Sequence, residues 1–393
     1  MSSVASSATF GRVGRRLLVA IALCGLTLAI AAPSATAAAV PQPPLRSGTS
    51  TSSGSWVVLP LGQLSDKENT FWQLLHLAAG STSWSQVTPE GTADNGGLVA
   101  GMSGPSVLAG VLPSQLLTFS PLSVSSDSGG TWNPVYLPGA VAQVPDGLAV
   151  DSGGDGRELA IVGKRVLAAP SAASTWSTLV SLSTLRRLFP SCGGQRLQAV
   201  AFTPAGLPLV GVQCRHGVGL FTEAFGSWRH VGPRLGPKLG AAPTSVLRLE
   251  TNGSAITALL AVVHSGHTQL VATWQPADGV WTNSPALTVR SGPTATSIGQ
   301  SGQIGVLAGS KHGSVVEEAA PGDKWTVLPA PPHATVALAS SAPAPSPNET
   351  GGDPIELFTS DGSGFSVYAL PPSGTSWLKV QSTQVPLAYG SSS

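Results

Sequence analysis

A tryptophan recurs seven times along this chain in one local setting. A turn rich in Gly, Ser or Asp comes before it, and a short β-prone run that often ends in Pro comes after it. The successive spacings are 48, 44, 52, 53, 44 and 52 residues, for Trp84, Trp132, Trp176, Trp228, Trp281, Trp325 and Trp377. Self-similarity at such a period indicates that one structural unit of about 40 to 50 residues is repeated.

Each repeat also divides into four short β-prone runs. In the sixth repeat these runs are 294–300, 303–310, 313–319 and 324–328. Four short strands joined by tight turns make one blade of a β-propeller, whereas a Gly-rich β-sandwich does not explain seven matched settings. The sequence therefore predicts an all-β, seven-bladed β-propeller over residues 55–390, and six or eight blades fit the spacing less well.

The first repeat is irregular, because Trp56 precedes Trp84 by only 28 residues. We expect residues 55–61 to form the second strand of the first blade. The missing first strand would then come from the C-terminus, around residues 385–389, and such sharing would close the ring. Residues 40–54 are rich in Pro, Ser, Thr and Gly and are predicted to be a linker.

The first 39 residues are laid out like a secretory signal peptide. A basic start is followed by an apolar run over 17–32 and by small residues over 35–39 that offer A-x-A cleavage sites. A retained membrane anchor is the alternative, but the run is shorter than the roughly 20 residues that a membrane span needs. Arg15 and Arg16 leave twin-arginine and general secretion both open. The sequence thus predicts a secreted or cell-envelope protein.

The chain has three cysteines. Cys24 lies inside the apolar run after Leu23, a setting that does not favour lipidation. Cys192 and Cys214 remain after cleavage, and two cysteines in an exported protein predict a disulfide. Closing a loop of this length should contribute about 3 kcal/mol to stability.

Composition limits the partners. The formal net charge is +1, which does not support binding to nucleic acid or to an anionic membrane. We expect membrane contact only through an uncleaved signal sequence. His264-x-x-His267 lacks a third metal ligand nearby, so no metal site is predicted. We also expect a monomer without a cofactor.

One turn matches the Asp-box pattern S-x-D-x-G-x-T-W completely, through Ser125, Asp127, Gly129, Thr131 and Trp132. This turn resembles the bacterial neuraminidase repeat of sialidase-like propellers and of photosystem-assembly-type propellers. The resemblance implies that Asp127 accepts backbone N–H groups on the turn between the third and fourth strands. That turn lies on the face opposite the usual active site, so these five residues are predicted to be structural.

Sialidase activity is not expected. The family implies three arginines for the substrate carboxylate, a Tyr–Glu nucleophile pair and an Asp acid. Here Arg46 lies in the predicted linker, and no Arg-Ile-Pro-like context follows it. The chain has three tyrosines, of which Tyr136 and Tyr368 fall within predicted strands and Tyr389 lies near the C-terminus. No catalytic residue is therefore predicted.

Arg, Lys and His collect in the loops that join neighbouring blades and in those that join second and third strands. These loops lie on one face of a propeller. In the third to sixth blades they contain the candidate ligand-binding residues Arg186, Arg187, Arg196, Arg215, His216, His267, Arg290, Lys311 and His312, and also Lys164, Arg165, Arg234, Lys238, His264 and His333. Arginine binds carboxylate or phosphate through two hydrogen bonds.

Two functions follow from this face. The first is an exported, non-enzymatic propeller that binds an acidic glycan or a protein partner. The second is a divergent sialidase-like glycoside hydrolase, for which acids facing each other across the mouth would be needed. A third reading is that these charges are ordinary solvated loop residues.

Overall fold

The computed structural model describes residues 41–43, 46–66, 69–89, 96–111, 122–135, 145–151, 156–171, 175–277, 279–290, 292–310, 313–341, 353–371 and 374–387. The predicted signal peptide (1–39), Tyr136 and Tyr389 lie outside these residues.

The described residues form antiparallel groups of four strands. The first groups are β1 (Ser47–Thr51), β2 (Gly54–Gly62), β3 (Thr70–Ala78) and β4 (Ser85–Gln86); β5 (Leu98–Ser103), β6 (Ser106–Val111), β7 (Leu122–Ser125) and β8 (Asn133–Val135); and β9 (Gly147–Val150), β10 (Glu158–Val162), β11 (Arg165–Ala169) and β12 (Ser177–Ser181). We call each group a blade and name it by its strands.

The later blades follow the same order. They are β13 (Arg196–Phe202), β14 (Pro208–Gln213), β15 (Gly219–Ala224) and β16 (Ser227–His230); β17 (Thr244–Asn252), β18 (Ala255–His264), β19 (His267–Gln275) and β20 (Thr282–Asn283), with β21 (Leu287–Val289) also paired to β19; β22 (Ala295–Ile298), β23 (Ile304–Ser310), β24 (Gly313–Ala319) and β25 (Thr326–Val327); and β26 (Thr335–Ser340), β27 (Ile355–Ser360), β28 (Gly364–Ala369) and β29 (Leu378–Gln384).

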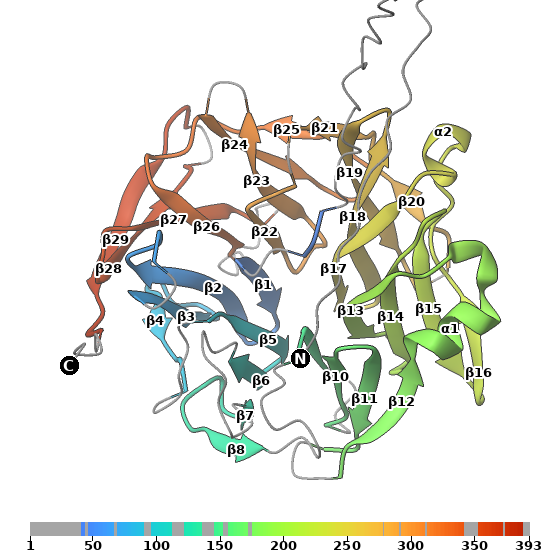
Figure 1. Cartoon of the computed structure of the whole chain (residues 1–393). Helices are drawn as coiled ribbons and strands as arrows, with labels where there is room; N and C mark the ends of the chain where they lie inside the picture. The colour runs from blue at the N-terminus through green and yellow to red at the C-terminus, as the bar shows by residue number, and fades with distance from the viewer. Residues whose placement is uncertain are drawn as a thin grey trace, which may run out of the picture. The chain divides into compact units, whose positions relative to one another are not determined.

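The blades surround a common axis, with the first strand of each nearest the centre (Figure 1). Apolar clusters fill the space between neighbouring blades. One of them joins Ile161 and Val166 of the β9–β12 blade to Val210 and Phe221 of the β13–β16 blade. Blades packed face to face around an axis are the architecture of a β-propeller.

Helices are short. Helix α1 (Leu182–Leu188) follows β12, and the Ser181 side chain caps it by accepting a hydrogen bond from the Thr184 N–H at 3.1 Å. A 3-10 turn, Pro190–Cys192, comes next, and α2 (Pro237–Gly240) lies between β16 and β17. In the part of the chain that the structure describes, no helix is long and apolar enough to cross a membrane.

The predicted linker contains a strand. Ser47–Thr51 forms β1, the first strand of its blade, and pairs antiparallel with β2 and parallel with β22. The expectation that residues 385–389 supply this strand is wrong. The described part of that segment follows β29, where the Val385 N–H bonds the Ser363 carbonyl at 2.9 Å.

Crowding at the axis explains why β1 does not resemble a strand in sequence. A Cβ on Gly48 would lie 2.6 Å from the Ala339 Cα, and the Ser50 hydroxyl donates to the Ser340 carbonyl. Only small side chains fit where β26 approaches so closely. The resulting Ser/Thr/Gly composition is the one that also marks linkers.

The repeated tryptophans join neighbouring blades. Trp132, Trp281, Trp325 and Trp377 each donate their indole N–H to a backbone carbonyl just beyond the last strand of the preceding blade, at 2.6 to 3.0 Å. The acceptors are Val87, Val231, Pro285 and Pro329. These four tryptophans thus join successive blades at their outer strands, whereas the Trp176 indole N–H is buried with no partner among the described residues.

Trp84 makes the corresponding contact between the two ends of the chain. Its indole N–H donates to the Glu356 carboxyl group at 2.7 Å. Its backbone N–H and carbonyl pair with the Gln381 side-chain amide, both at 2.8 Å. Trp84 therefore ties the first blade to the β26–β29 blade, and the Gly62 N–H bonds the Gly362 carbonyl at 2.7 Å across the same junction.

The Asp-box turn joins β7 to β8. The Asp127 carboxylate accepts the Thr131 N–H at 2.8 Å and the Thr131 hydroxyl at 2.7 Å, and the Ser125 hydroxyl donates to it at 2.7 Å. These bonds, led by that of the Thr131 N–H, lower the pKa of Asp127 to about 2. Gly129 takes a φ of 83°, and Trp132 bonds the preceding blade. Among the described residues, the hydrogen bonds of the Asp127 carboxylate go to Ser125 and Thr131 of the same turn.

Candidate functional site

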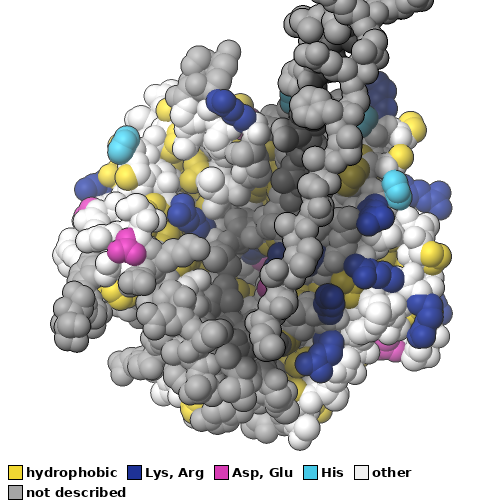
Figure 2. Space-filling model, in the orientation of Figure 1, with side chains coloured by type: hydrophobic (Ala, Val, Ile, Leu, Met, Phe, Trp, Pro, Cys, Tyr) yellow, Lys and Arg dark blue, Asp and Glu magenta, His cyan; other side chains and the backbone are white. Residues whose placement is uncertain are grey.

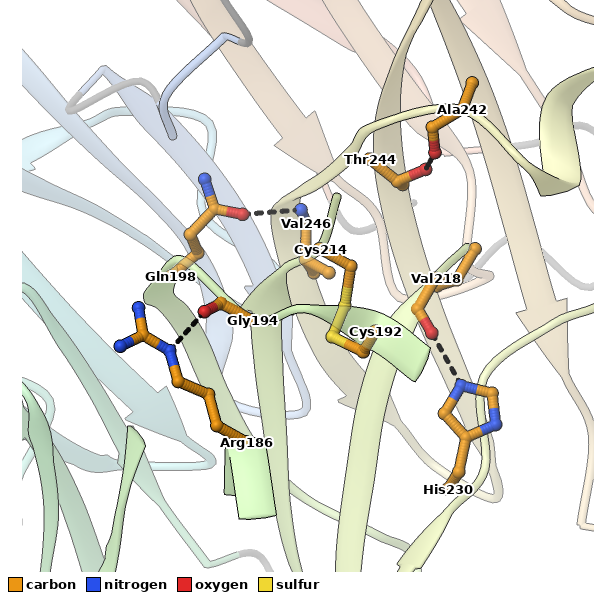
Figure 3. Close-up of a disulfide and its surroundings, with 10 residues drawn as sticks. All are labelled: Arg186, Cys192, Gly194, Gln198, Cys214, Val218, His230, Ala242, Thr244 and Val246. Carbon is orange, nitrogen blue, oxygen red and sulfur yellow. Dashed lines mark hydrogen bonds between the residues drawn. A yellow bond between two sulfur atoms is a disulfide. The ribbon is translucent and has the colours of Figure 1, made fainter. Parts of the chain in front are cut away.

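A disulfide joins Cys192, in the connection after β12, to Cys214, just after β14 (Figure 3). The prediction of this bond is confirmed. Cys214 also exchanges two backbone hydrogen bonds with Thr244, at 2.9 and 3.0 Å, and Thr244 begins the next blade. The disulfide therefore fixes the α1 connection to the β13–β16 blade at its junction with the β17–β20 blade.

Several of the predicted ligand-binding residues gather around this disulfide. The Arg186 Nε donates to the Gly194 carbonyl at 2.5 Å, so this arginine braces the loop that contains Cys192 (Figure 3). Arg215 follows Cys214, and its backbone N–H bonds the Cys192 carbonyl at 2.9 Å. His216 lies next to it, with Nδ1 3.2 Å from the Ala241 carbonyl oxygen. Arg187 is exposed on α1.

Removing the disulfide should loosen this loop. We expect the Cys192→Ala/Cys214→Ala double variant to lose about 3 kcal/mol of unfolding free energy, because the open chain gains conformational entropy when unfolded. Urea denaturation of both proteins, followed by tryptophan fluorescence, measures this loss. Wild type unfolded in the presence of reductant should match the double variant, and equal midpoints for oxidised wild type and variant would contradict the expectation.

Arg196 lies at the start of β13, at one end of the axis. Its guanidinium bonds the Gln42 side chain and the Asp146 carboxylate, each at 3.1 Å. Asp146 directly precedes β9, so this bridge connects the inner strands of two blades and the N-terminal segment. Arg196 is thus partly neutralised, unlike its exposed neighbours on α1.

A second group lies in the β17–β20 blade. His264 and His267 flank the two-residue turn between β18 and β19, and Arg290 follows β21, one position beyond the Thr268–Val289 pair. The register therefore places His267 opposite Arg290. Among the described residues, no group of three or more His, Cys, Asp or Glu side chains is arranged to hold a metal. Lys311 and His312 lie outside the described residues.

The exposed cations concentrate on one face. Between residues 164 and 238 the sequence has nine Lys or Arg residues and one acid, a formal net charge of +8 against +1 for the whole chain. Eight of these nine, all except Arg229 of β16, gather on the side of Figure 2 where Figure 1 places α1, β13 and β14. We define the basic face by the exposed residues Lys164, Arg165, Arg186, Arg187, Arg196, Arg215, Arg234 and Lys238.

The sequence did not reveal a second site, a cavity of about 350 Å³ along the axis. The inner strands β5, β9, β13 and β17 line it, and β1 closes one side. Asp146 lies at one end of the lining, and Gly253, after β17, lies at the other. The described lining thus runs from one face of the propeller toward the other.

An ion pair lies in this cavity. Arg248 and Glu250, two residues apart on β17, contact each other, and the Arg248 guanidinium also bonds the Gly48 carbonyl at 3.2 Å and the Thr49 hydroxyl at 2.8 Å. The Thr49 hydroxyl donates to Glu250 Oε1 at 2.8 Å. Burial lowers the pKa of Arg248 to about 10. Glu250 Oε2 is buried and has no hydrogen-bond partner among the described residues.

No local signal marks this pair in the sequence. The motif Arg-Leu-Glu sits in an ordinary β-prone run, and its partner strand β1 lies about 200 residues earlier. Two same-face residues on a strand, Arg then Glu, are the only hint, and an exposed pair has the same spacing.

No protein-family model matches the sequence, and no curated protein matches it either. Solved structures do resemble the fold. A protein of Lactobacillus plantarum superposes with a TM-score of 0.53 at 10% identity, covering 85% of this chain and 97% of its own. A putative 6-phosphogluconolactonase of Bacteroides fragilis gives 0.50 at 11%, covering 85% and 96%. YCF48 of Cyanidioschyzon merolae gives 0.44 at 14%, covering 81% and 94%.

The structural neighbours are β-propeller proteins, so the chain has a β-propeller fold. Identities of this size show the fold alone. The resemblance to sialidase-like propellers rests on the Asp-box turn, and activity must be argued from the chain's own residues.

Proposed function

We propose that this chain is an exported, seven-bladed β-propeller that binds an acidic glycan through its basic face. The order of the four-stranded blades and the Trp84 contacts between first and last blades support the blade count. The disulfide supports export, since such bonds persist in oxidising compartments. The N-terminal 39 residues would be the signal peptide.

The observation that carries the binding proposal is the one-sided charge. Eight of the nine cations within residues 164–238 form the basic face, and the single acid of this stretch, Glu223, accepts the Gly226 N–H at 2.6 Å in the β15–β16 hairpin. Exposed guanidinium groups on one surface can bind the carboxylates that recur along a polyuronate chain. Loops fixed by a disulfide lose less entropy on binding than free loops do.

Binding without hydrolysis is the form that we propose. The acids that line the axial cavity are Asp146 and Glu250, and each already bonds an arginine, Arg196 or Arg248. Glycoside hydrolysis needs two carboxyl groups free to act on either side of the scissile bond. Tyr368, the tyrosine inside the described strands, faces the Lys379 ammonium group 5.9 Å from its ring centre.

Binding of the mature protein to alginate and hyaluronan, with neutral dextran as control, tests this function. We expect both polyuronates to bind, dextran not to bind, and affinity to fall as salt rises past about 0.15 M. The Arg187→Ala/Arg215→Ala variant should raise the Kd at least about tenfold. A matched variant, Arg229→Ala/Lys324→Ala, removes two exposed cations elsewhere and should bind like wild type.

The proposal is wrong if Arg187→Ala/Arg215→Ala binds polyuronate as tightly as the matched variant does. It is also wrong if dextran binds as strongly as the polyuronates. The same mixtures are assayed for new reducing ends. Their release would replace the binding function with a glycoside hydrolase.

A further inference from the structure

The wall of the axial cavity is made largely of strand edges. β5, β9, β13 and β17 are each the terminal strand of their sheet, so one edge of each carries N–H and C=O groups outside the ladder. The lining residues place these edges around the cavity. Some of these edge groups already have side-chain partners, since the Thr251 hydroxyl donates to the Phe202 carbonyl and Gln198 accepts the Val246 N–H. Buried main-chain groups require hydrogen-bond partners, so the remaining edge groups offer donors and acceptors to an occupant.

The charges within the cavity balance. Arg248 and Glu250 form a pair, and Asp146, at one end, is bonded to Arg196. A cationic occupant would therefore meet Arg248 beside the carboxylate, and an anionic one would meet Glu250. A charged occupant would therefore be attracted by one member of the Arg248–Glu250 pair and repelled by the other. Its net charge would also be poorly solvated inside the cavity.

Glu250 determines which hydrogen-bonding group the occupant must bring to this part of the cavity. Oε1 receives Arg248 and Thr49, whereas Oε2 is buried with no partner among the described residues. A carboxylate oxygen accepts hydrogen bonds and cannot donate. The occupant must therefore bring a donor to this point while it supplies both donors and acceptors to the strand edges.

We infer that the axial cavity binds a small, neutral, polyhydroxylated molecule, a monosaccharide or a cyclic polyol. A hydroxyl group both donates and accepts, so a ring of hydroxyls matches the remaining main-chain donors and acceptors and gives Glu250 Oε2 its donor. The volume of about 350 Å³ lies at the lower end of the roughly 300–1,000 Å³ range of small-molecule sites. The site is distinct from the basic face, which it meets at the Asp146–Arg196 bridge.

Calorimetry with myo-inositol, glucose and galactose tests the site, with glucosamine and glucuronate as charged counterparts. We expect at least one neutral probe to bind with a Kd of about 1 mM or tighter. Glucosamine and glucuronate should each bind at least about tenfold more weakly than that neutral probe.

Two variants locate the binding. Glu250→Gln alone leaves Arg248 buried without its counter-charge and can unfold the chain. The double variant Arg248→Met/Glu250→Gln removes both charges, so it should fold and lose the binding of the neutral probe at least about tenfold. The matched control, Arg229→Met/Glu223→Gln, makes the same replacements on the outer β15–β16 hairpin and should bind like wild type.

The inference is overturned if no neutral probe binds wild type, if the charged sugars bind equally well, or if the folded double variant binds like the control. Polyuronate binding through the basic face should persist in the double variant. Failure of the polyol site and failure of the proposed function are thus separate results.

Discussion

Replacing Trp84 with Ala should cost about 3–5 kcal/mol of unfolding free energy, a loss typical of a buried tryptophan. The side chain is 4% exposed and meets the Phe358 ring edge-on, with ring centres 5.0 Å apart. Its indole N–H is also the donor to Glu356, whose pKa is raised by burial and held down in part by this bond. Loss of Trp84 therefore leaves both a cavity and a buried carboxyl group without its donor.

Two further variants separate packing from ring closure. Trp84→Phe keeps an aromatic ring but removes the N–H, and we expect a loss of about 1–3 kcal/mol. Trp325→Ala removes the equivalent tryptophan between two successive blades, where the side chain is partly exposed and bonds the Pro285 carbonyl at 3.0 Å. Urea denaturation compares the three. If Trp325→Ala costs as much as Trp84→Ala, the contact between the chain ends has no special importance for stability.

Replacing Glu158 with Gln should flatten the dependence of stability on pH. Glu158 starts β10, is 2% exposed, and burial raises its pKa to about 8 from an ordinary 4.5. Its Oε2 has no partner among the described residues. Between these two pH values the folded chain holds a proton that the unfolded chain has released. The stability of wild type is therefore fully present below about pH 4.5 and falls as pH rises toward about 8.

The expected slope from this group alone is about 1.4 kcal/mol of unfolding free energy per pH unit. Gln does not titrate, so Glu158→Gln should lose that slope and be the more stable protein at pH 8. Burial also raises the pKa of Glu317, Glu318, Asp353 and Glu356, which leaves a residual slope of the same sign in the variant. Urea midpoints at pH 5, 6, 7 and 8 measure it. Parallel curves for the two proteins would show that Glu158 is charged in the folded state.

Features that arise within one blade could be read from the sequence. Strands of a blade pair with their neighbours in the chain, so the recurring tryptophan predicted the propeller, and two nearby cysteines predicted the bond between Cys192 and Cys214. The cations of the basic face were found for the same reason, because each lies in or beside a connection between strands, and strand order fixes the face on which that connection lies.

The axis was decided only by tertiary structure. Inner strands meet there across the ring, so Thr49 bonds Glu250 over a separation of 201 residues, and β1 pairs with β22. Close approach at Gly48 requires small residues, which gave a true strand the composition of a linker. The sequence by itself determined the repeated blade, since its contacts are local. Strand β1, the Arg248–Glu250 pair and the cavity around that pair could be recognised only in the tertiary structure, since their contacts join distant parts of the chain.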